Sequence, residues 1–159
     1  MSYQAVILTV SDSCAAGTRT DTSGPAIRAM LENAGFAVQA MQTVPDEEGQ
    51  ISAAIVHACD ILQADLVVTT GGTGLSARDV TPEATLAVLD REIRAIPVAM
   101  WVEGLKSTPR AMLSRAVAGI RGHTLVLNVP GSEKAARENL GAVAATLDHA
   151  LRMLAGGGH

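Results

Sequence analysis

The stretch DLVVTTGGTG, residues 65–74, decides the fold because a run of branched aliphatic residues leads directly into a glycine-rich turn. Such a run is typical of a β-strand that is covered on both faces. Similar runs occur at residues 5–10 (AVILTV) and 124–129 (TLVLNV), and residues 36–44 (FAVQAMQTV) alternate moderately. The sequence therefore predicts four strands.

The segments between these strands have the pattern of helices. Residues 23–35 place apolar side chains at helical spacing and end in a glycine, and acidic residues open a second predicted helix after the second strand. Thr81, followed by Pro82, is the predicted N-cap of a helix that runs to about residue 91. Ser132 is the predicted N-cap of the last helix.

Strands that alternate with helices of crossover length form βαβ units. We therefore expect an α/β fold, a three-layer α-β-α sandwich around a mainly parallel, doubly wound sheet. Residues 1–155 are expected to form a single domain, followed by a frayed tail at residues 156–159. Residues 96–107 are a further predicted helix, whereas residues 108–122 are left without an assigned element.

Composition limits the classes of partner. The formal charge of −4 and the lack of any Lys/Arg run argue against nucleic acid. No apolar segment reaches membrane-spanning length, and the N-terminus lacks a signal peptide, so we expect a cytoplasmic protein without a membrane partner. Cys14 and Cys59 show neither a disulfide framework nor metal-ligand spacing, which favours two free thiols.

Polar, acidic or glycine residues follow all four predicted strands. Ligands of parallel α/β sheets bind at the carboxyl ends of the strands, so this edge is the candidate site. The residues at the four strand ends are Ser11, Asp12 and Ser13; Pro45 and Asp46; Gly71, Gly72, Thr73 and Gly74; and Asn128, Val129, Pro130, Gly131 and Ser132.

The glycine-rich turn has two possible roles that stay open at this point. Glycines let backbone N–H groups approach a phosphate, but they also simply permit a tight bend. The common mononucleotide fingerprint G-x-x-x-x-G-K-[ST] is missing, and the turn does not complete the dinucleotide pattern or lead straight into a helix. The turn alone is therefore a weak signal for phosphate.

A divalent cation would reconcile phosphate with the nearby acids. Mg²⁺ binds one or two carboxylates together with phosphate oxygens and water, and Asp79, Asp46 or Asp12 are candidate ligands. Arg78 and Arg115 are candidates to offset the remaining charge. Each acid also has a purely structural alternative: Asp46 as a helix cap, Asp12 in a turn, and Asp79 paired with Arg78 or another neighbour.

Nucleophilic catalysis by the protein has little support. Ser11, Ser114 and Ser132 have no histidine at a telling spacing, and a protein-bound zinc site is not indicated. What remains is phosphate-centred chemistry in which the protein positions two substrates and a metal neutralises charge.

Six motifs carry a family resemblance that covers nearly the whole chain. In order, VSD, DTSGPAI, VPDE, TTGGTGLSARDVTPEAT, TPRAMLSRAVAGIRG and TLVLNVPGS resemble the motifs of the molybdopterin adenylyltransferase family (MogA/MoaB-like). The same fold recurs in the G domain of plant and animal molybdenum-cofactor proteins. The resemblance implies an Mg²⁺-dependent nucleotidyltransferase that moves AMP from ATP to the terminal phosphate of molybdopterin and releases pyrophosphate.

The resemblance also implies roles for individual positions. Asp46 and Asp79 are the implied catalytic acids, in metal and nucleotide handling. The implied substrate- and nucleotide-binding residues are Ser11, Asp12, Thr70, Gly71, Gly72, Thr73, Gly74, Arg78, Ser114, Arg115, Asn128, Pro130, Gly131 and Ser132. Within this set, Ser114 and Arg115 are implied ligands of the pterin phosphate.

Assembly and an alternative function follow from the same resemblance. It implies homotrimers or hexamers, and a molybdate-inserting protein as a further partner. Met100, Trp101 and Leu105 belong either to such an interface or to an ordinary core helix. The alternative function is that of a non-catalytic, MoaB-type molybdopterin-binding carrier.

Overall fold

A six-stranded sheet in the order β2-β1-β3-β6-β5-β4 forms the middle layer of the computed structural model, which describes residues 2–157. β2, β1, β3 and β6 run parallel to one another, whereas β5 is antiparallel to β6 and β4 is antiparallel to β5. The strands are β1 (Gln4–Val10), β2 (Ala37–Val44), β3 (Leu66–Thr70), β4 (Arg91–Glu92), β5 (Ala118–Arg121) and β6 (Thr124–Val129).

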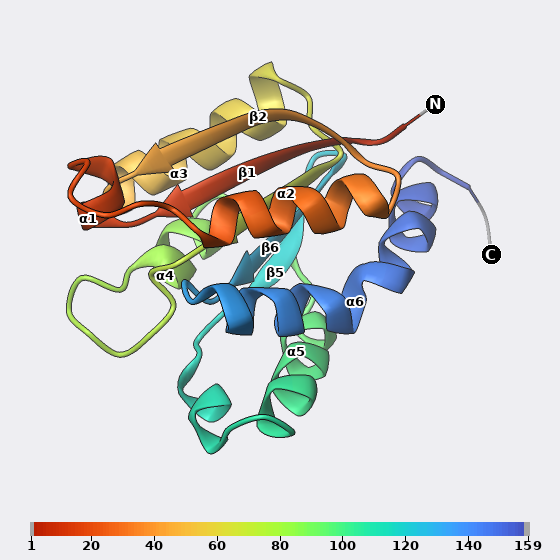
Figure 1. Cartoon of the computed structure of the whole chain (residues 1–159). Helices are drawn as coiled ribbons and strands as arrows, with labels where there is room; N and C mark the ends of the chain where they lie inside the picture. The colour runs from red at the N-terminus through yellow and green to blue at the C-terminus, as the bar shows by residue number, and fades with distance from the viewer. Residues whose placement is uncertain (1, 158–159) are drawn as a thin grey trace.

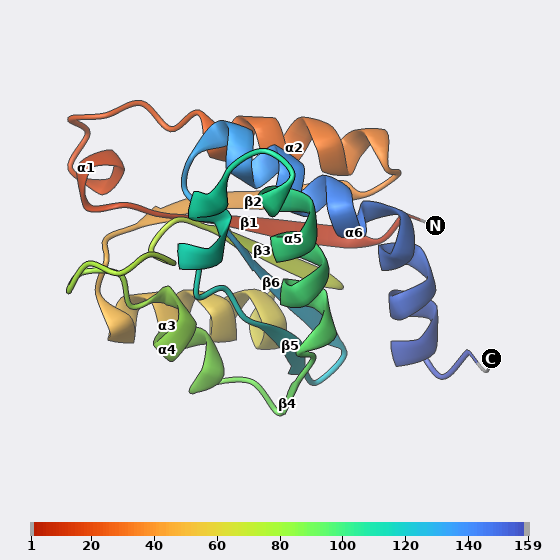
Figure 2. The same cartoon turned by 90° about the horizontal axis from the view of Figure 1, so that it is seen from below.

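Helices cover both faces of this sheet (Figure 1). Figure 2 shows α2 and α6 on one face and α3 and α4 on the other, with α5 beside α6. This arrangement confirms the predicted three-layer α/β sandwich with a mainly parallel sheet. The helices are α1 (Asp12–Ala15), α2 (Ser23–Asn33), α3 (Glu48–Val56), α4 (Thr81–Leu86), α5 (Ala95–Leu105) and α6 (Glu133–Leu154), with a π-helical turn at His57–Ile61 and a 3₁₀ helix at Pro109–Leu113.

Two hydrophobic clusters fill the space on either side of the sheet. Ile7 of β1 belongs to the cluster that includes Leu31 of α2 and Leu140 of α6, whereas the next residue, Leu8, belongs to the cluster that includes Ile55 of α3. Successive side chains of a strand point to opposite faces, so a strand covered on both sides needs apolar residues throughout. This confirms the prediction that the aliphatic runs are strands covered on both faces.

Helix α4 departs from its prediction at both ends. Val80 is its N-cap, and Thr81 is the first helical residue rather than the cap. Thr81 is fully buried and its hydroxyl donates to the carbonyl of Gly71 at 2.9 Å, so a tertiary contact takes the place of the expected capping bond. The helix also ends at Leu86 instead of about residue 91, because Arg91 already belongs to β4.

The region around residues 108–122 contains elements that the sequence left unassigned. A 3₁₀ helix at Pro109–Leu113 is followed by the four-residue strand β5. β5 and the two-residue strand β4 are held by antiparallel pairing with their neighbours, and such short segments carry no periodic pattern of their own. β4 and β5 extend the parallel sheet by an antiparallel edge.

The last helix begins as predicted, since the hydroxyl of Ser132 accepts a hydrogen bond from the Ala135 N–H at 3.3 Å. At the other end, Gly156 has a φ of 86° and the Gly157 N–H donates to the carbonyl of Arg152 at 2.9 Å. These two glycines of the predicted tail close the helix, and Gly156 does so in the left-handed conformation that glycine favours. Residues 158 and 159 lie outside the described residues.

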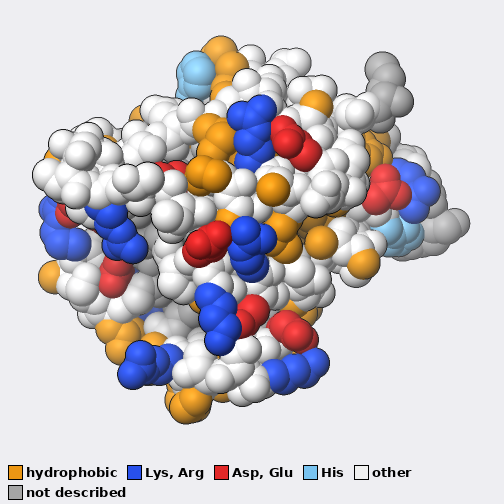
Figure 3. Space-filling view, in the orientation of Figure 1, with side chains coloured by type: hydrophobic (Ala, Val, Ile, Leu, Met, Phe, Trp, Pro, Cys, Tyr) orange, Lys and Arg blue, Asp and Glu red, His pale blue; other side chains and the backbone are white. Residues whose placement is uncertain are grey.

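The surface carries both signs of charge. On the face shown in Figure 3, Lys and Arg side chains are interspersed with Asp and Glu side chains. Among residues 2–157, no helix combines the length and the apolar character needed to cross a membrane. Of the α5 residues considered for an interface, Met100 is buried in the core, while Leu105 is 45% exposed.

Candidate functional site

The carboxyl ends of the four parallel strands meet at one edge of the molecule, together with α1 and the long loop between β3 and α4 (Figure 1). The chain reverses its winding direction between β1 and β3, because β1 is followed by β2 on one side and β3 lies on the other. Crevices at such a switch point are the usual ligand sites of open α/β sheets. The four strand ends that the sequence predicted to share one edge do so.

Two cavities open at this edge. The first, of about 360 Å³, lies between the ends of β1 and β3, the loop before α2 and the start of α6. The second, of about 630 Å³, lies between the glycine loop, the end of α5, the 3₁₀ helix and the start of α6. Both cavities are lined by Gly72, Asp79, Gly131 and Ser132, so they meet along these four residues.

Most of the predicted site residues line one cavity or the other. In addition to the four shared residues, the first cavity is lined by Ser11, Asp46, Thr70 and Gly71, and the second by Thr73, Gly74, Ser114 and Pro130. Four predicted residues line neither cavity, namely Asp12, Arg78, Arg115 and Asn128.

Asp46 and Asp12 hold each other across the ends of β1 and β2. The Asp12 N–H donates to Asp46 Oδ2, and the Asp46 N–H donates to Asp12 Oδ1, both at 2.9 Å. Burial raises the pKa of the Asp46 carboxyl, and the negative charges of Asp12 and Asp79 raise it further, against the lowering effect of the Asp12 N–H. Asp46 is not the helix cap, because Glu47 holds that position in α3.

Arg78 connects the loop that follows the glycines to Asp12 and Glu47. Its Nε and Nη2 atoms donate to the two carboxylate oxygens of Asp12, each at 3.0 Å, and Nη2 also reaches Glu47 Oε1 at 3.0 Å. The hydrogen bond from Arg78 holds the pKa of the Asp12 carboxyl below its usual range. Arg78 therefore pairs with Asp12 and Glu47, not with Asp79.

The glycine loop requires glycine at its first two positions. Gly71 and Gly72 have φ values of 100° and 69°, which side-chain-bearing residues rarely adopt. A Cβ atom on Gly71 would collide with the backbone carbonyl of Val10, and one on Gly72 would collide with the hydroxyl of Thr81. The close approach of loop and strand therefore depends on the missing side chains.

Asn128 is part of the core rather than of the cavity walls. It is fully buried, and its side-chain amide donates to the hydroxyls of Thr69 at 2.8 Å and Thr85 at 3.1 Å. Its Oδ1 atom accepts the Val117 N–H at 3.2 Å. These bonds link β3, β6, α4 and the segment before β5 behind the site.

Each of the two predicted metal ligands, Asp46 and Asp79, has a carboxylate oxygen available for a metal. Within residues 2–157, the hydrogen bonds to the carboxylates of Asp46 and Asp79 end on Oδ2, from the Asp12 N–H and the Ser76 N–H respectively. No group of three or more metal-ligating side chains gathers in this part of the chain. Two carboxylates with free oxygens suit Mg²⁺, which completes its shell with phosphate and water, better than a metal that needs a full protein cage.

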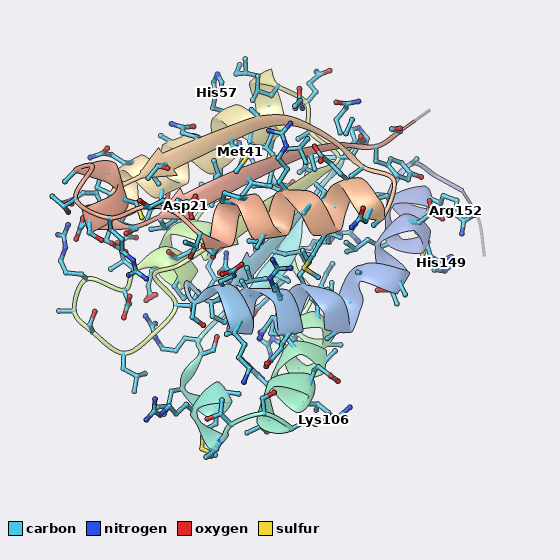
Figure 4. All side chains as sticks on the ribbon, in the orientation of Figure 1. Asp21, Met41, His57, Lys106, His149 and Arg152 are labelled. Atoms are coloured by element: carbon cyan, nitrogen blue, oxygen red, sulfur yellow. The ribbon has the colours of Figure 1, made fainter. Side chains whose placement is uncertain are left out.

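The sequence reasoning missed Asp21, which also lines the first cavity. Figure 4 shows Asp21 ahead of α2, where the loop from α1 arrives. Its carboxylate accepts the hydroxyl of Thr9 at 2.7 Å and the N–H of Gly24 at 3.0 Å. The sequence feature that could have indicated Asp21 is the DTSG run, because an aspartate three residues before a helical N–H commonly caps that turn.

Comparisons with known proteins identify relatives of this chain. A family model described as a probable molybdopterin binding domain matches residues 6–149. A molybdopterin adenylyltransferase of Helicobacter pylori is 38% identical over 154 residues, covering 94% of this chain and 86% of the relative. The crystal structure of the molybdopterin biosynthesis enzyme MoaB from Thermus thermophilus superposes with a TM-score of 0.92 at 49% identity and covers 97% of each chain.

Some relatives are much longer than this chain. The molybdenum cofactor synthesis protein cinnamon of Drosophila melanogaster is 40% identical over 149 residues, which cover 93% of this chain but only 25% of that protein. The match to the family model and the full-length matches to smaller relatives nevertheless agree. The chain belongs to the MogA/MoaB family of molybdopterin-binding proteins of molybdenum cofactor biosynthesis.

Proposed function

We propose that this chain is a molybdopterin adenylyltransferase, which transfers AMP from ATP to the terminal phosphate of molybdopterin and releases pyrophosphate. The observation that carries the proposal is the meeting of two cavities at Gly72, Asp79, Gly131 and Ser132. A two-substrate transfer needs separate sites whose reacting ends come together. A carrier of one ligand would need only one of the two cavities.

In this proposal the first cavity takes the nucleotide and the second takes the pterin. Ser114, the implied ligand of the pterin phosphate, lines the second cavity, while Asp46 lines the first. The N-terminus of the 22-residue helix α6, capped by Ser132, lies at the junction. Its free backbone N–H groups favour negative charge at the point where the two phosphates have to meet.

The transfer itself needs little chemistry from the protein. An oxygen of the terminal phosphate attacks the α-phosphorus of ATP, the bond from that phosphorus to the bridging oxygen breaks, and pyrophosphate leaves. A phosphate monoester has a second pKa of about 6 and is ionised at neutral pH, so no protein base has to remove a proton. Alignment and charge stabilisation are the remaining tasks.

Asp46 and Asp79 would hold Mg²⁺ in this proposal. When bound, the ion neutralises charge on the α-phosphate and on the departing pyrophosphate. The Gly71 N–H donates to the Val129 carbonyl at 3.1 Å, so in this proposal the N–H groups that approach the phosphates come from the loop residues after it. Asp12 holds Asp46, and Arg78 holds the loop through Asp12, without either residue lining a cavity.

The non-catalytic, MoaB-type carrier that the resemblance allows is the second candidate, because MoaB proteins as well as adenylyltransferases are relatives of this chain. Purified protein supplied with ATP, Mg²⁺ and molybdopterin separates the two. An adenylyltransferase releases pyrophosphate above a no-protein control and binds ATP in a calorimetric titration. A carrier binds molybdopterin but shows neither ATP binding nor pyrophosphate release, and that result would overturn the proposal.

We further infer that copies of this chain associate as trimers or hexamers, as the family resemblance implies. The helix α5 supports this inference, because Val98, Val102 and Leu105 leave 49%, 56% and 45% of their surfaces exposed. Light scattering coupled to size-exclusion chromatography measures the mass in solution. A monomer of 16.4 kDa at micromolar concentration would contradict association.

A further inference from the structure

The loop from Gly74 to Asp79 is closed at its base by a residue from another part of the chain. Arg115 lies beyond the 3₁₀ helix, yet its Nε atom donates to the carbonyl of Gly74 at 2.8 Å. Its Nη2 atom donates to the carbonyl of Asp79 at 2.6 Å. One guanidinium group therefore joins the first and the last residue of the loop.

The third nitrogen of Arg115 is held by a carboxylate that no functional role accounts for. Nη1 donates to both oxygens of Glu83, at 2.6 and 3.0 Å. Glu83 lies in the first turn of α4, one turn after the end of the loop. The planar guanidinium fixes all three directions at once, which a flexible ammonium group cannot do.

The backbone of Arg115 adds a further bond to the same structure. Its N–H donates to the carbonyl of Thr73 at 2.8 Å, just before the loop. The far side of the loop is fastened by Arg78 to Asp12 and Glu47. Asp79 therefore sits on a loop that Arg115 holds at Gly74 and Asp79, and that Arg78, the residue before Asp79, holds through Asp12 and Glu47.

From these contacts we infer that Arg115 and Glu83 are positioning residues that place Asp79 at the junction of the two cavities. The inference rests on the proposed function, because it explains how one of its two metal-binding acids is held. It also changes the role that the resemblance implies for Arg115. The side chain lines neither cavity and each of its nitrogens already has a partner within the protein, so it holds the loop instead of binding the pterin phosphate.

Arg115→Lys separates the two roles. Lysine keeps the positive charge that a phosphate ligand needs, but it cannot reach both carbonyls in the fork geometry of arginine. A positioning role predicts a kcat that falls by about 10- to 100-fold, a higher Mg²⁺ concentration at half-maximal rate, and an unchanged KM for molybdopterin. A raised KM for molybdopterin at unchanged kcat would show direct binding and overturn the inference.

Glu83→Gln provides a second test, for which the positioning role and the phosphate-binding role of Arg115 predict different results. If Arg115 only positions the loop, loss of the carboxylate weakens the fastening and lowers kcat in the same direction as Arg115→Lys, by about tenfold. If Arg115 binds phosphate, release from Glu83 leaves turnover intact or tightens pterin binding. Arg28→Lys and Glu32→Gln are matched controls, since this exposed pair on α2, 2.8 Å apart, touches neither cavity and should leave turnover unchanged.

A readout without substrates keeps this inference apart from the proposed function. Trypsin cleavage after Arg78, followed by mass spectrometry, reports the opening of the loop. Cleavage should be severalfold faster in Arg115→Lys and Glu83→Gln than in the wild type and the two α2 controls. Wild-type protein without turnover would refute the proposed function alone, whereas equal cleavage rates in folded variants would refute the positioning role. If Arg115→Lys does not fold, as judged by circular dichroism, Glu83→Gln decides the question.

Discussion

Asp12 and Asp46 each receive the other's backbone N–H on their carboxylates, at 2.9 Å in both directions. The exchange joins the second residues after two parallel strands, two positions beyond Val10 and Val44, the last pair of their backbone register. The bond from the Asp12 N–H occupies Oδ2 of Asp46, and Asp46 lines the first cavity. We therefore expect Asp12 to act through Asp46, whereas the resemblance implies that Asp12 itself binds substrate or nucleotide.

Removal of Asp12 should lower activity without unfolding the protein. Asp12→Ala deletes the acceptor for the Asp46 N–H and the partner of Arg78, so both the acid and the loop lose a support. Loss of such an outer contact typically lowers metal affinity or activity by about 10- to 100-fold. Steady-state turnover measures the effect, with Asp148→Ala at an exposed position of α6 as the control. Full activity in Asp12→Ala would contradict the role of the exchange.

Asp46 should set an acidic limb in the dependence of Mg²⁺ binding on pH. Its pKa is raised, first by burial and then by the charges of Asp12 and Asp79, so protons displace the metal at a higher pH than an ordinary aspartate would require. Calorimetric Mg²⁺ titrations with ATP present, from about pH 4 to about pH 8, bracket the ordinary carboxyl range and check the shift. An acidic limb at the position of an ordinary aspartate would contradict this prediction.

The same raised pKa has a consequence for stability, with a definite sign. A carboxyl group whose pKa is higher in the folded than in the unfolded state destabilises the fold increasingly as the pH rises from its unfolded-state pKa to its folded-state pKa. The penalty is complete above the folded-state pKa and disappears below the unfolded-state pKa. Asp46→Asn should therefore unfold at a higher temperature than the wild type at neutral pH, and this difference should shrink in acid. A variant less stable at neutral pH would contradict the account of Asp46.

Asn128 should behave as a core residue in unfolding experiments. Asn128→Ala leaves the buried Val117 N–H without its acceptor and Thr69 without a donor, and it also opens a cavity. We expect a loss of roughly 2–4 kcal/mol in the free energy of unfolding. Urea denaturation measures it, and Asn33→Ala, at an exposed position of α2, should stay within about 0.5 kcal/mol of the wild type. Unchanged stability in Asn128→Ala, together with weaker ATP binding, would instead support a direct role in the nucleotide pocket.

The glycine loop and helix α3 offer a paired test of glycine. Gly71→Ala places a Cβ against the carbonyl of Val10 at a φ of 100°, so we expect destabilisation of about 1–3 kcal/mol or more. Gly49→Ala meets open space inside a helix and should stabilise the protein by about 0.5–1 kcal/mol. Thermal unfolding of both variants measures the difference, and equal effects would mean that the turn does not need glycine.

Sequence patterns predict the features that depend on local structure. The runs at β1, β3 and β6 are mostly apolar because both faces of the sheet are covered. The crossover helices predicted between them make the strands parallel, and this places their carboxyl ends at one edge. Ser132 is predictable as a cap because its bond to Ala135 spans only three residues. The capping bond expected of Thr81 is absent because a contact with Gly71, ten residues away, takes its hydroxyl.

What depends on distant contacts could not be read from the sequence. The exchange between Asp12 and Asp46 spans 34 residues, and the bond from Arg115 to the Asp79 carbonyl spans 36. An arginine near a candidate phosphate site is expected to bind phosphate, and only the structure shows that its nitrogens are committed elsewhere. The two-residue strand β4 likewise exists through its pairing with β5 and not through its own propensity.

The most direct test of adenylyl transfer uses ATP with a label on its α- or γ-phosphate and measures which product carries the label. Wild-type protein with molybdopterin, Mg²⁺ and ATP labelled at the α-phosphate should yield a labelled pterin whose mass has increased by one adenylyl group, while label at the γ-phosphate should leave as pyrophosphate. Asp79→Asn should form almost none of this product. Transfer of the γ-label to the pterin, or no labelled pterin from wild-type protein that binds both substrates, would contradict adenylyl transfer at the junction of the two cavities.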